Sequence, residues 1–531
     1  MIGSKPLVDP SMNPGKTWWL PSAFGLTIIL VGLATMLSIH IKADDIWWHL
    51  STGQYILDNF SLPDSNMYSH TAPDHHWLPH EWASEVVFYL VYQGLGFKGL
   101  VALGVLLNTL ACALVFRLTL RYSNAPYLSI AITLLAALMM LGNFSLRPYL
   151  FGNLFFIIAL HALEEPAAGG KLRPVLVFLL FSGWANFHGS FILGLALIML
   201  YMSAQVAIQL RAKRRSFAVL RALGLDLLVA IIASTVTPHH IYGLIFPFTY
   251  LQAAFTGQMT YLTNISEWQS AGFDTPLGRM ITFYALFCFF AIAGSATSPA
   301  PVHVGLLVAF TFFSFTTIRN IPLLGIAATP ALARHLPKAL GRVGNLLGAI
   351  SPLAKPARRL HESLLTQDRR SMGILLPGLL TLFALLVFSL PSTWPMSYAR
   401  LTGKHKLADL SPSFYPAGLI QHLKDRGTSN HVFQYFNWGG AFIYGLYPIQ
   451  RVFIDQRNDC YPISVFLDYF AVHELRRDWR GVLDRWSIDM VAYPPNEALS
   501  KQLREEPGWT LEYEDDQAVL FVRKKEPLNQ S

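Results

Sequence analysis

Uninterrupted apolar runs follow one another through most of this sequence. Several are close to the ~20 residues that a helix needs to cross the hydrocarbon core of a bilayer. Hydrophobic residues fill 53% of the 531 positions and charged residues only 14%, against roughly 25% charged residues in soluble proteins. The sequence therefore predicts a polytopic α-helical membrane protein of about eleven spans, near residues 18–41, 98–120, 125–144, 147–163, 173–187, 190–209, 220–237, 279–296, 302–318, 321–336 and 373–391.

Basic residues gather in alternate short connections between these runs. Such a bias marks the cytoplasmic side of a membrane protein, and it accounts for the net charge of +8 without a nucleic acid partner. With the amino terminus inside, an odd number of spans places the connections 42–97 and 238–278 and the tail from 392 onward outside. We therefore expect a multi-pass protein of the inner (cytoplasmic) membrane whose chemistry faces away from the cytoplasm.

The tail, 392–531, differs in composition from the membrane domain, 1–391, and predicts a separate extracytoplasmic α/β domain. A helix is expected near 413–426 and strands near 431–436, 451–455, 488–493, 509–514 and 517–523. Asp455, Arg457 and Asp459 follow one of these strands, where an ion pair that fixes the turn is favoured over a ligand site. The tail sequence holds no Gly-x-Gly-x-x-Gly or P-loop pattern, so we expect no nucleotide there.

The densest group of ionisable residues begins where the first predicted span ends. Asp44 and Asp45 are adjacent there, followed by Trp47, Trp48 and His49. Two carboxylates at a helix end are costly unless they face water, a cation or a partner; an interfacial cap with its aromatic belt is the simpler alternative. A site is favoured because the same connection continues with Asp58, Asp64, His70, Asp74, His75, His76, His80 and Glu81.

Glycosyl transfer from a sugar phosphate explains why carboxylates would gather at such a place. An acceptor hydroxyl needs a base to take its proton as it attacks, and the leaving phosphate needs positive charge or hydrogen-bond donors. Asp44 or Asp45 would be the base. Arg and His side chains, or a metal ion, would meet the phosphate.

Several short motifs resemble those of the GT-C fold glycosyltransferases. They begin with Asp45 to Leu50 and end in the tail, and in between they are spread over most of the chain. Within that superfamily the chain is similar to bacterial membrane proteins grouped with the protein mannosyltransferases, and its first motif is also similar to the catalytic subunit of oligosaccharyltransferases. The motifs are Asp45-Ile46-Trp47-Trp48-His49-Leu50, Leu62-Pro63-Asp64, Tyr68-Ser69-His70-Thr71, Trp77 with His80-Glu81-Trp82, Trp184-Ala185-Asn186-Phe187-His188-Gly189, Ile265-Ser266-Glu267-Trp268, Arg319-Asn320-Ile321-Pro322, Asn437-Trp438-Gly439-Gly440 and Phe453-Ile454-Asp455-Gln456-Arg457.

The resemblance implies a polyprenyl-phosphate-linked sugar donor, an inverting transfer and a catalytic Asp in the first outer connection. Asp44 or Asp45 occupies that position. His49, His80 and Glu81 lie in the same stretch as candidate substrate-binding residues. The chain departs from oligosaccharyltransferases because its tail has no Trp-Trp-Asp motif, so glycosylation of Asn sequons is not supported.

Five further residues are candidates for substrate binding. Arg147 and Arg319 would grip the donor phosphate, although Arg147 is slightly more easily explained as a snorkelling side chain. Arg319 is the better candidate since it stands on the predicted outer side, against the basic bias. Asn186 and His188 would bind the donor or simply form a polar hairpin tip. Glu267 would hold a metal or position the acceptor, unless it is a solvated loop carboxylate.

The histidines His70, His75, His76 and His80, together with Glu81, have no spacing that matches a closed tetrahedral zinc site. A divalent cation such as Mg²⁺ or Mn²⁺, held by Asp45 and Glu267, is more plausible than zinc but is not required.

Two other classes of function stay open at this point. A transporter or a flippase for lipids or glycans would also place charged residues near membrane depth, although we find no internal repeat of the kind that transporters show. A non-catalytic scaffold of envelope glycan assembly is the third reading. The sequence does not identify the sugar, and the acceptor could be a glycan, a lipid or a protein.

Overall fold

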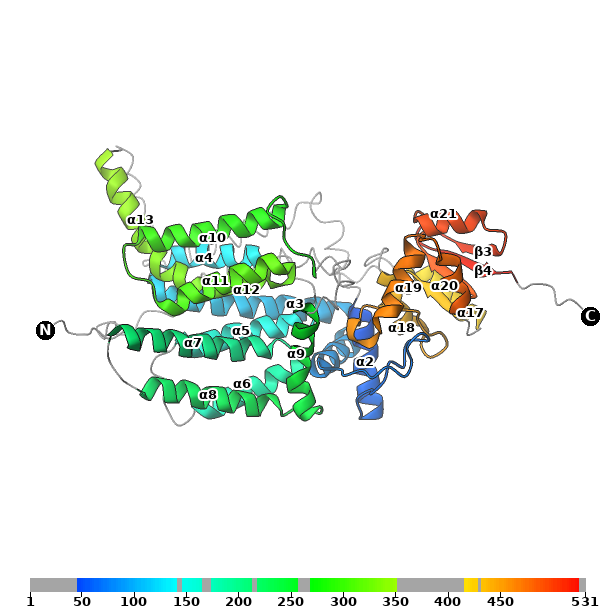
Figure 1. Ribbon diagram of the computed structural model, residues 1–531, viewed down its shortest axis with the longest axis horizontal. Helices are drawn as coiled ribbons and strands as arrows, with labels where there is room; N and C mark the ends of the chain where they lie inside the picture. Colours follow the sequence, from blue (N-terminus) through cyan, green and yellow to red (C-terminus); the bar gives the residue numbers. More distant parts are fainter. Residues whose placement is uncertain are drawn as a thin grey trace, which may run out of the picture.

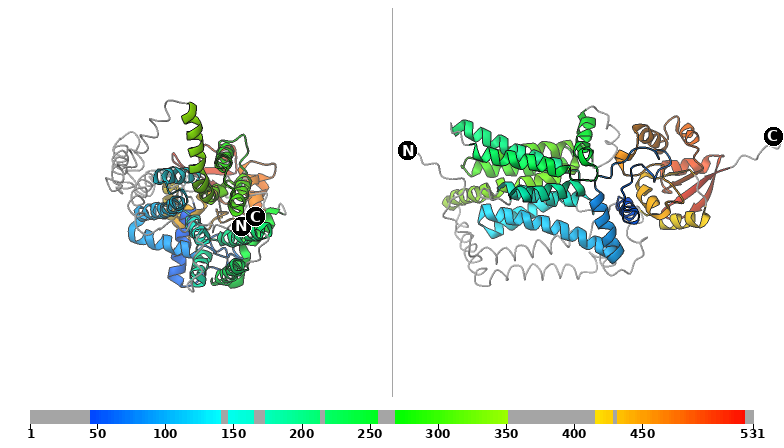
Figure 2. Two further views of the ribbon diagram at one scale, coloured as in Figure 1. Left: turned by 90° about the vertical axis from the view of Figure 1, so that its left-hand side faces the viewer. Right: turned by 90° about the horizontal axis from the view of Figure 1, so that it is seen from below.

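The computed structural model describes residues 45–140, 146–164, 173–212, 217–255, 268–350, 415–427 and 431–524. It contains a bundle of long helices and, beyond one end of that bundle, a smaller α/β tail (Figures 1 and 2). We call the end of the bundle nearest the tail the tail-side end. The predicted spans 18–41 and 373–391, and the candidates Asp44 and Glu267, lie outside the described residues.

Most helices of the bundle overlap the spans predicted between 98 and 336, but the predicted span 321–336 is divided between the helices Ile321–Ala327 and Thr329–Ile350. One of them, α9, was not predicted and lies across the tail-side end (Figure 1). The bounds are α3 Trp82–Ser123, α4 Pro126–Met140, α5 Tyr149–Glu164, α6 Arg173–Phe187, α7 Phe191–Ala212, α8 Ala218–Ser234, α9 His240–Phe255, α10 Pro276–Gly294, α11 Pro301–Thr316, α12 Ile321–Ala327 and α13 Thr329–Ile350.

Three of the described helices have segments both long enough and apolar enough to cross a membrane: Ala102–Ser123 of α3, Phe191–Arg211 of α7 and Pro276–Gly294 of α10. Other apolar helices of the bundle, such as Tyr149–Glu164 and Arg173–Phe187, are shorter. Large apolar side chains point outward from the bundle, with Phe283 69% and Phe312 63% exposed, as expected where lipid is the solvent. The number of about eleven spans stays a prediction.

The chain enters the bundle through two helices at its tail-side end. Helix α2, Ile46–Asn59, packs against the first turns of α3, and α3 bends at Gly96, where φ is +62°. Close packing of α2 requires glycine at position 53, because a Cβ there would lie 2.2 Å from the carbonyl oxygen of Glu85. The bend turns α3 from this end of the bundle into its membrane-spanning segment.

The tail contains a four-stranded mixed sheet with helices around it. Strand order is β1-β2-β4-β3; β1 and β2 are parallel, while β4 is antiparallel to both β2 and β3. The elements are α17 Ala417–Arg426, β1 Val432–Gln434, α18 Gly439–Leu446, α19 Ile463–His473, α20 Trp479–Arg485, β2 Met490–Tyr493, α21 Ala498–Glu505, β3 Trp509–Glu514 and β4 Val519–Arg523. The expected α/β composition is therefore present.

The strand predicted at 451–455 is wrong. Its residues are apolar because Val452, Phe453 and Ile454 are fully buried, yet they belong to no strand of the described sheet. Instead the side chain of Gln434 accepts a hydrogen bond from Phe453 N at 2.8 Å and donates one to the carbonyl oxygen of Ile454. This glutamine thus satisfies two of the backbone groups that a strand partner would otherwise meet.

This buried segment of the tail also binds the loop 62–80. Val452 forms an isolated parallel bridge with Ser69, and Thr71 Oγ1 donates a 2.6 Å hydrogen bond to the carbonyl oxygen of Phe453. The amide of Asn66 donates to the carbonyl oxygen of Cys460 at 2.9 Å. The loop and the tail therefore share one hydrophobic core, so they fold as one unit.

A buried arginine lies at the centre of that unit. Arg457 is bonded through Nε and Nη2 to the carboxylate of Asp455, at 2.8 and 2.6 Å, and Nη2 also donates to Asn66 Oδ1 at 2.7 Å. Its guanidinium lies 4.5 Å from the ring centre of Trp77 and 4.9 Å from that of Tyr68. The Asp455–Arg457 pair therefore fixes the turn and also holds the 62–80 loop against the tail.

Candidate active site

Asp45 comes directly before α2 and forms an ion pair with Arg147, which stands two residues before α5. The distance from Asp45 Oδ2 to Arg147 Nε is 2.8 Å, and the two side chains are 18% and 14% exposed. The pair joins two elements at the tail-side end of the bundle. The ion pair therefore engages Oδ2 of Asp45 with a guanidinium.

Glu81 has a different environment, just ahead of α3. Its Oε1 atom lies 3.2 Å from His188 Nε2 and 3.6 Å from His80 Nε2. His188 belongs to the tight connection between α6 and α7, which approaches α5 closely at Gly152. A Cβ at position 152 would lie 2.5 Å from Ser190 Oγ and 2.9 Å from His188 Nδ1. The glycine therefore permits the histidine to reach Glu81.

Hydrogen bonds around His188 fix the orientation of its ring. Ser190 N donates to Nδ1 at 3.1 Å, and Ser190 Oγ, which accepts from Trp184 Nε1 at 3.0 Å, is 2.7 Å from the same nitrogen. Since Nδ1 is the accepting nitrogen, the neutral ring carries its proton on Nε2. That proton is presented to Glu81.

The proton affinities of the two partners are shifted in opposite directions. Burial raises the pKa of Glu81; the positive charges of His80 and Arg319 lower it, while Asp459 and Asp45 raise it further. Burial, followed by the charges of Arg319 and His80, lowers the pKa of His188 well below its usual value. A carboxyl with a raised pKa beside a neutral imidazole is better suited to accept a proton than an ordinary glutamate.

A second carboxylate and histidine lie one turn further along α3. Glu85 Oε1 is 3.4 Å from His49 Nδ1, and both side chains are almost completely inaccessible. Burial first, and then the charge of Glu81, raises the pKa of Glu85, whereas burial lowers the pKa of His49. His49 therefore contacts Glu85 in the core and is not placed to bind a substrate directly.

Arg319 belongs to the short turn Ile318–Asn320 that leads into α12. Its guanidinium lies 4.9 Å from the ring centre of Trp268, and its charge acts on both Glu81 and His188. The structure thus brings Arg319, Glu81 and His188 into one electrostatic cluster with Asp45 and Arg147.

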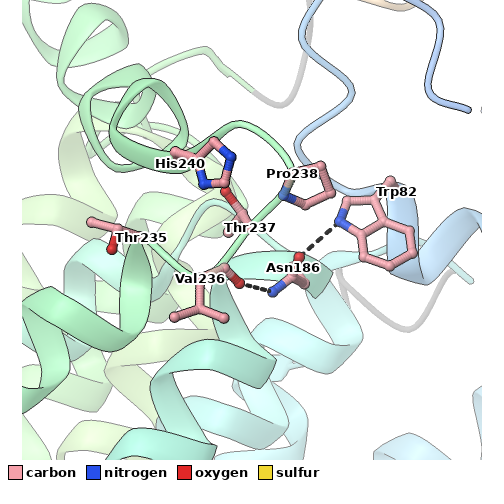
Figure 3. A pocket seen from close by; sticks show the side chains of 7 residues that line it. All are labelled: Trp82, Asn186, Thr235, Val236, Thr237, Pro238 and His240. Atoms are coloured by element: carbon pink, nitrogen blue, oxygen red, sulfur yellow. Dashed lines mark hydrogen bonds between the residues drawn. The ribbon is translucent and has the colours of Figure 1, made fainter.

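Asn186 is occupied by protein contacts. Its Oδ1 accepts from Trp82 Nε1 at 2.8 Å, and its Nδ2 donates to the carbonyl oxygen of Val236 at 2.7 Å (Figure 3). Nδ2 also donates to the carbonyl oxygen of Ser182 at 2.7 Å. These bonds join α3, α6 and the connection between α8 and α9. Asn186 therefore positions other groups and has little capacity left for a ligand.

Nothing in the sequence predicted that Asp459 would lie near Glu81, yet the charge of Asp459 raises the pKa values of both Glu81 and Glu85. It belongs to the tail, two residues after Arg457, and its Oδ2 atom is buried without a hydrogen-bond partner among the described residues. Burial raises the pKa of Asp459 to about 6. Only the packing of the tail on the 62–80 loop brings this carboxylate to the site.

Asn in place of Asp459 is expected to stabilise the protein at neutral pH. Because the pKa rises on folding from 3.8 to about 6, the carboxyl is protonated in both states below the lower value, and the penalty of burying its charge grows as pH rises between the two values and is complete above about 6. At ~1.4 kcal/mol per pKa unit the penalty amounts to about 3 kcal/mol. Thermal unfolding of the purified protein should show Asp459→Asn more stable than wild type at pH 7.5 and equal to it at pH 4; equal stability at both pH values would contradict the burial of this charge.

No group of three His, Cys, Asp or Glu side chains is arranged to hold a metal ion within the described ranges. Asp45, one of the two proposed ligands, is paired with Arg147, and Glu267 falls outside those ranges. A divalent cation stays an untested prediction.

No protein-family model matches the chain, and no curated protein matches it. Among solved structures the chain is similar to the crystal structure of ArnT from Cupriavidus metallidurans bound to undecaprenyl phosphate, with 14% identity and a TM-score of 0.49, over 94% of this chain and 97% of that chain. The same protein in the apo state matches with 14% identity and a TM-score of 0.48, over 94% and 98%. A likeness of this size assigns the chain to no family and carries no residue's role across.

Proposed function

We propose that this chain is a membrane glycosyltransferase that moves a sugar from a polyprenyl-phosphate-linked donor to an acceptor hydroxyl, with inversion, at the tail-side end of its helix bundle. One observation carries the proposal. Two carboxylates lie at this end in unlike surroundings, Asp45 paired with Arg147 and Glu81 facing His188. Two carboxyl groups in such different environments are typical of active sites in which one carboxylate stays ionised and the other exchanges a proton with the substrate.

Glu81 is the proposed base. The acceptor hydroxyl attacks the anomeric carbon of the sugar, its proton passes to Glu81, and the bond between that carbon and the phosphate oxygen breaks. The products are the glycosylated acceptor and polyprenyl phosphate, which keeps the electron pair of the broken bond. This assignment replaces Asp45 as base, since the ion pair with Arg147 already engages Oδ2 of Asp45, and it leaves Asp44 untested.

Arg319 and Arg147 are the proposed phosphate ligands. A guanidinium binds phosphate oxygens through two parallel hydrogen bonds, and both arginines stand at the end of the bundle where an anchored lipid phosphate would arrive. Arg147 would share its charge between Asp45 and the donor. The polyprenyl chain would lie along the lipid-facing helices, and this end of the bundle, with the tail, would face away from the cytoplasm as the distribution of basic residues predicts.

Arg319→Gln is expected to weaken the binding of undecaprenyl phosphate. A hydrogen bond to a charged group contributes ~1.5–3 kcal/mol, so the loss corresponds to about 10- to 100-fold in Kd. Binding to the full chain in lipid nanodiscs is measured with undecaprenyl phosphate and, for comparison, undecaprenol. Arg342→Gln, which changes an exposed arginine of α13, is the matched control.

Wild type and the control variant should both bind the phosphate and prefer it to the alcohol. Equal binding of undecaprenol, or an unchanged Kd in Arg319→Gln, would overturn the assignment of a phosphate site to Arg319.

A further inference from the structure

Helix α9 lies across the bundle instead of along it (Figures 1 and 2). The chain turns tightly into α9 after α8, because Gly243 approaches the connection so closely that a Cβ there would lie 2.8 Å from Thr237 Oγ1. The segments of α3, α7 and α10 that are long and apolar enough to cross a membrane run along the bundle. Helix α9 therefore runs along the plane of the bilayer, at the tail-side end.

One side of α9 packs on the candidate active site. The ring centre of Phe246 lies 4.8 Å from that of His80, and Nε2 of His80 is 3.6 Å from Glu81 Oε1. The next residue, Pro247, faces the connection between α6 and α7, where a Cβ at Gly189 would lie 3.9 Å from Pro247 Cγ. The position of α9 is therefore linked through His80 to Glu81.

The opposite side of α9 exposes apolar side chains, of which Tyr242 is the most accessible at 72%. Their spacing of i, i+1, i+4 and i+7 places them in one stripe along the helix. The sequence of α9 contains no Asp, Glu, Lys or Arg. We call these residues the α9 stripe: Ile241, Tyr242, Ile245 and Phe248.

The α9 stripe continues an exposed apolar surface of α8. Leu225, Leu228 and Ile232 follow one face of α8, and Val236 extends it into the connection that leads to α9; each is about half exposed. On a helix of an apolar bundle such a face lies in lipid. A contiguous apolar surface of this kind marks contact with a membrane or with another protein.

Lipid is the partner that fits both helices. A protein partner would cover the α9 stripe but would have to end where the lipid-facing side of α8 begins, whereas the bilayer covers both without a break. The tyrosine in the stripe also suits this place, because aromatic rings with a polar group are enriched at the boundary between headgroups and acyl chains.

We propose that the α9 stripe is inserted into the leaflet on the tail side of the membrane, with the helix axis in the plane of the interface. This contact with lipid goes beyond the proposed function and does not depend on it. Phe246 on the other side of α9 then holds His80, and with it Glu81, near the depth of the lipid headgroups. If the proposed donor is correct, its anchored phosphate lies at this depth as well.

The test is electron paramagnetic resonance of the full chain in liposomes of phosphatidylethanolamine and phosphatidylglycerol. A nitroxide label is attached through Ile241→Cys, Ile245→Cys or Phe248→Cys, one at a time; the native cysteines Cys112, Cys288 and Cys460 are buried. Collisions of the label are measured with oxygen, which dissolves in hydrocarbon, and with a neutral nickel chelate, which stays in water. Phe283→Cys of α10 and Glu505→Cys of α21, both at exposed positions, are the references for lipid and for water.

The ratio of oxygen collisions to nickel collisions should exceed one at all three positions of α9 and should lie between the ratios of the two references. A ratio equal to that of Glu505→Cys would place the stripe in water and overturn the proposal. Few collisions with both reagents would show that protein covers the stripe, which also overturns it, and dipolar broadening between labels would identify that protein as a second copy of the chain. These outcomes are independent of sugar transfer, so a failure of the insertion and a failure of the proposed function are distinguishable.

Discussion

Glutamine at position 81 is expected to lower the rate of sugar transfer by at least about 100-fold, the lower end of the range for a lost general base. The substitution keeps the size of the side chain and its contact with His188 Nε2, which lies 3.2 Å from Glu81 Oε1, but it removes the ability to accept a proton. Single-turnover transfer from a lipid-linked sugar measures the chemical step directly. Undecaprenyl phosphate should still bind.

Two comparisons make this prediction specific. Glu474→Gln changes an exposed carboxylate of the tail that pairs only with Arg476 among the described residues, and it should leave the rate unchanged. Asp45→Asn frees Arg147 from its partner and should alter donor binding more than the chemical step. If Glu81→Gln keeps the full rate of transfer and Asp45→Asn loses it, Asp45 is the base and Glu81 is not.

The pH dependence of the wild-type transfer rate also tests whether Glu81 is the base. A base acts only when ionised, and burial raises the pKa of Glu81. The rate should therefore be full above that raised pKa and fall as pH drops through it, at a pH higher than the 4.5 of an ordinary Glu. The residual rate of Glu81→Gln should lack this acid limb.

The largest effect on stability is expected from Arg457→Met, because the substitution leaves Asp455 as an unpaired charge in the core. Both side chains of this pair are 0% exposed, and breaking such a pair costs about 3–5 kcal/mol. The contacts of Arg457 with Asn66, Trp77 and Tyr68 are lost as well. Denaturant unfolding followed by tryptophan fluorescence measures the free energy.

Arg485→Met is the matched control, since it removes a pair with Asp468 in which the arginine is 54% exposed. Exposed pairs contribute less than ~1 kcal/mol. Replacing Asp455 and Arg457 together by apolar residues should recover much of the loss, because no charge is then left buried alone. Equal stabilities of Arg457→Met and the control would show that the pair does not hold the loop to the tail.

The helices were predictable because hydrocarbon demands long apolar segments whatever their neighbours are. Strands β1, β2 and β4 were visible as β-branched or aromatic runs that are buried for all or most of their length, and β3 was predicted although its side chains are mostly exposed. Residues 451–455 show the same pattern but form no sheet strand, because the side chain of Gln434 and the loop 62–80 meet their backbone groups. The apolar residue types predict that a segment is buried. They do not predict which group forms hydrogen bonds with its backbone.

The site was only partly predictable for a related reason. Because charged and polar residues are rare in this apolar chain, the sequence identified Asp45, Arg147, His188 and Arg319 as separate candidates. Which of them contact one another depends on how the helices pack. The connection 42–97 and the tail were treated as separate segments, yet Asn66 bonds to Cys460 and Arg457 across almost 400 positions. The effect of Asp459 on the pKa of Glu81 depends on these contacts between the 62–80 loop and the tail, which the sequence does not reveal.

The account's central claim is that the chain breaks a bond between a sugar and a polyprenyl phosphate. Wild-type protein in liposomes is given radiolabelled undecaprenyl-phosphate-linked hexoses together with a membrane fraction as acceptor. We predict that label passes to the acceptor, that undecaprenyl phosphate appears in equal amount, and that Glu81→Gln yields neither product. Label that crosses the bilayer still attached to its lipid would contradict the account and identify a flippase.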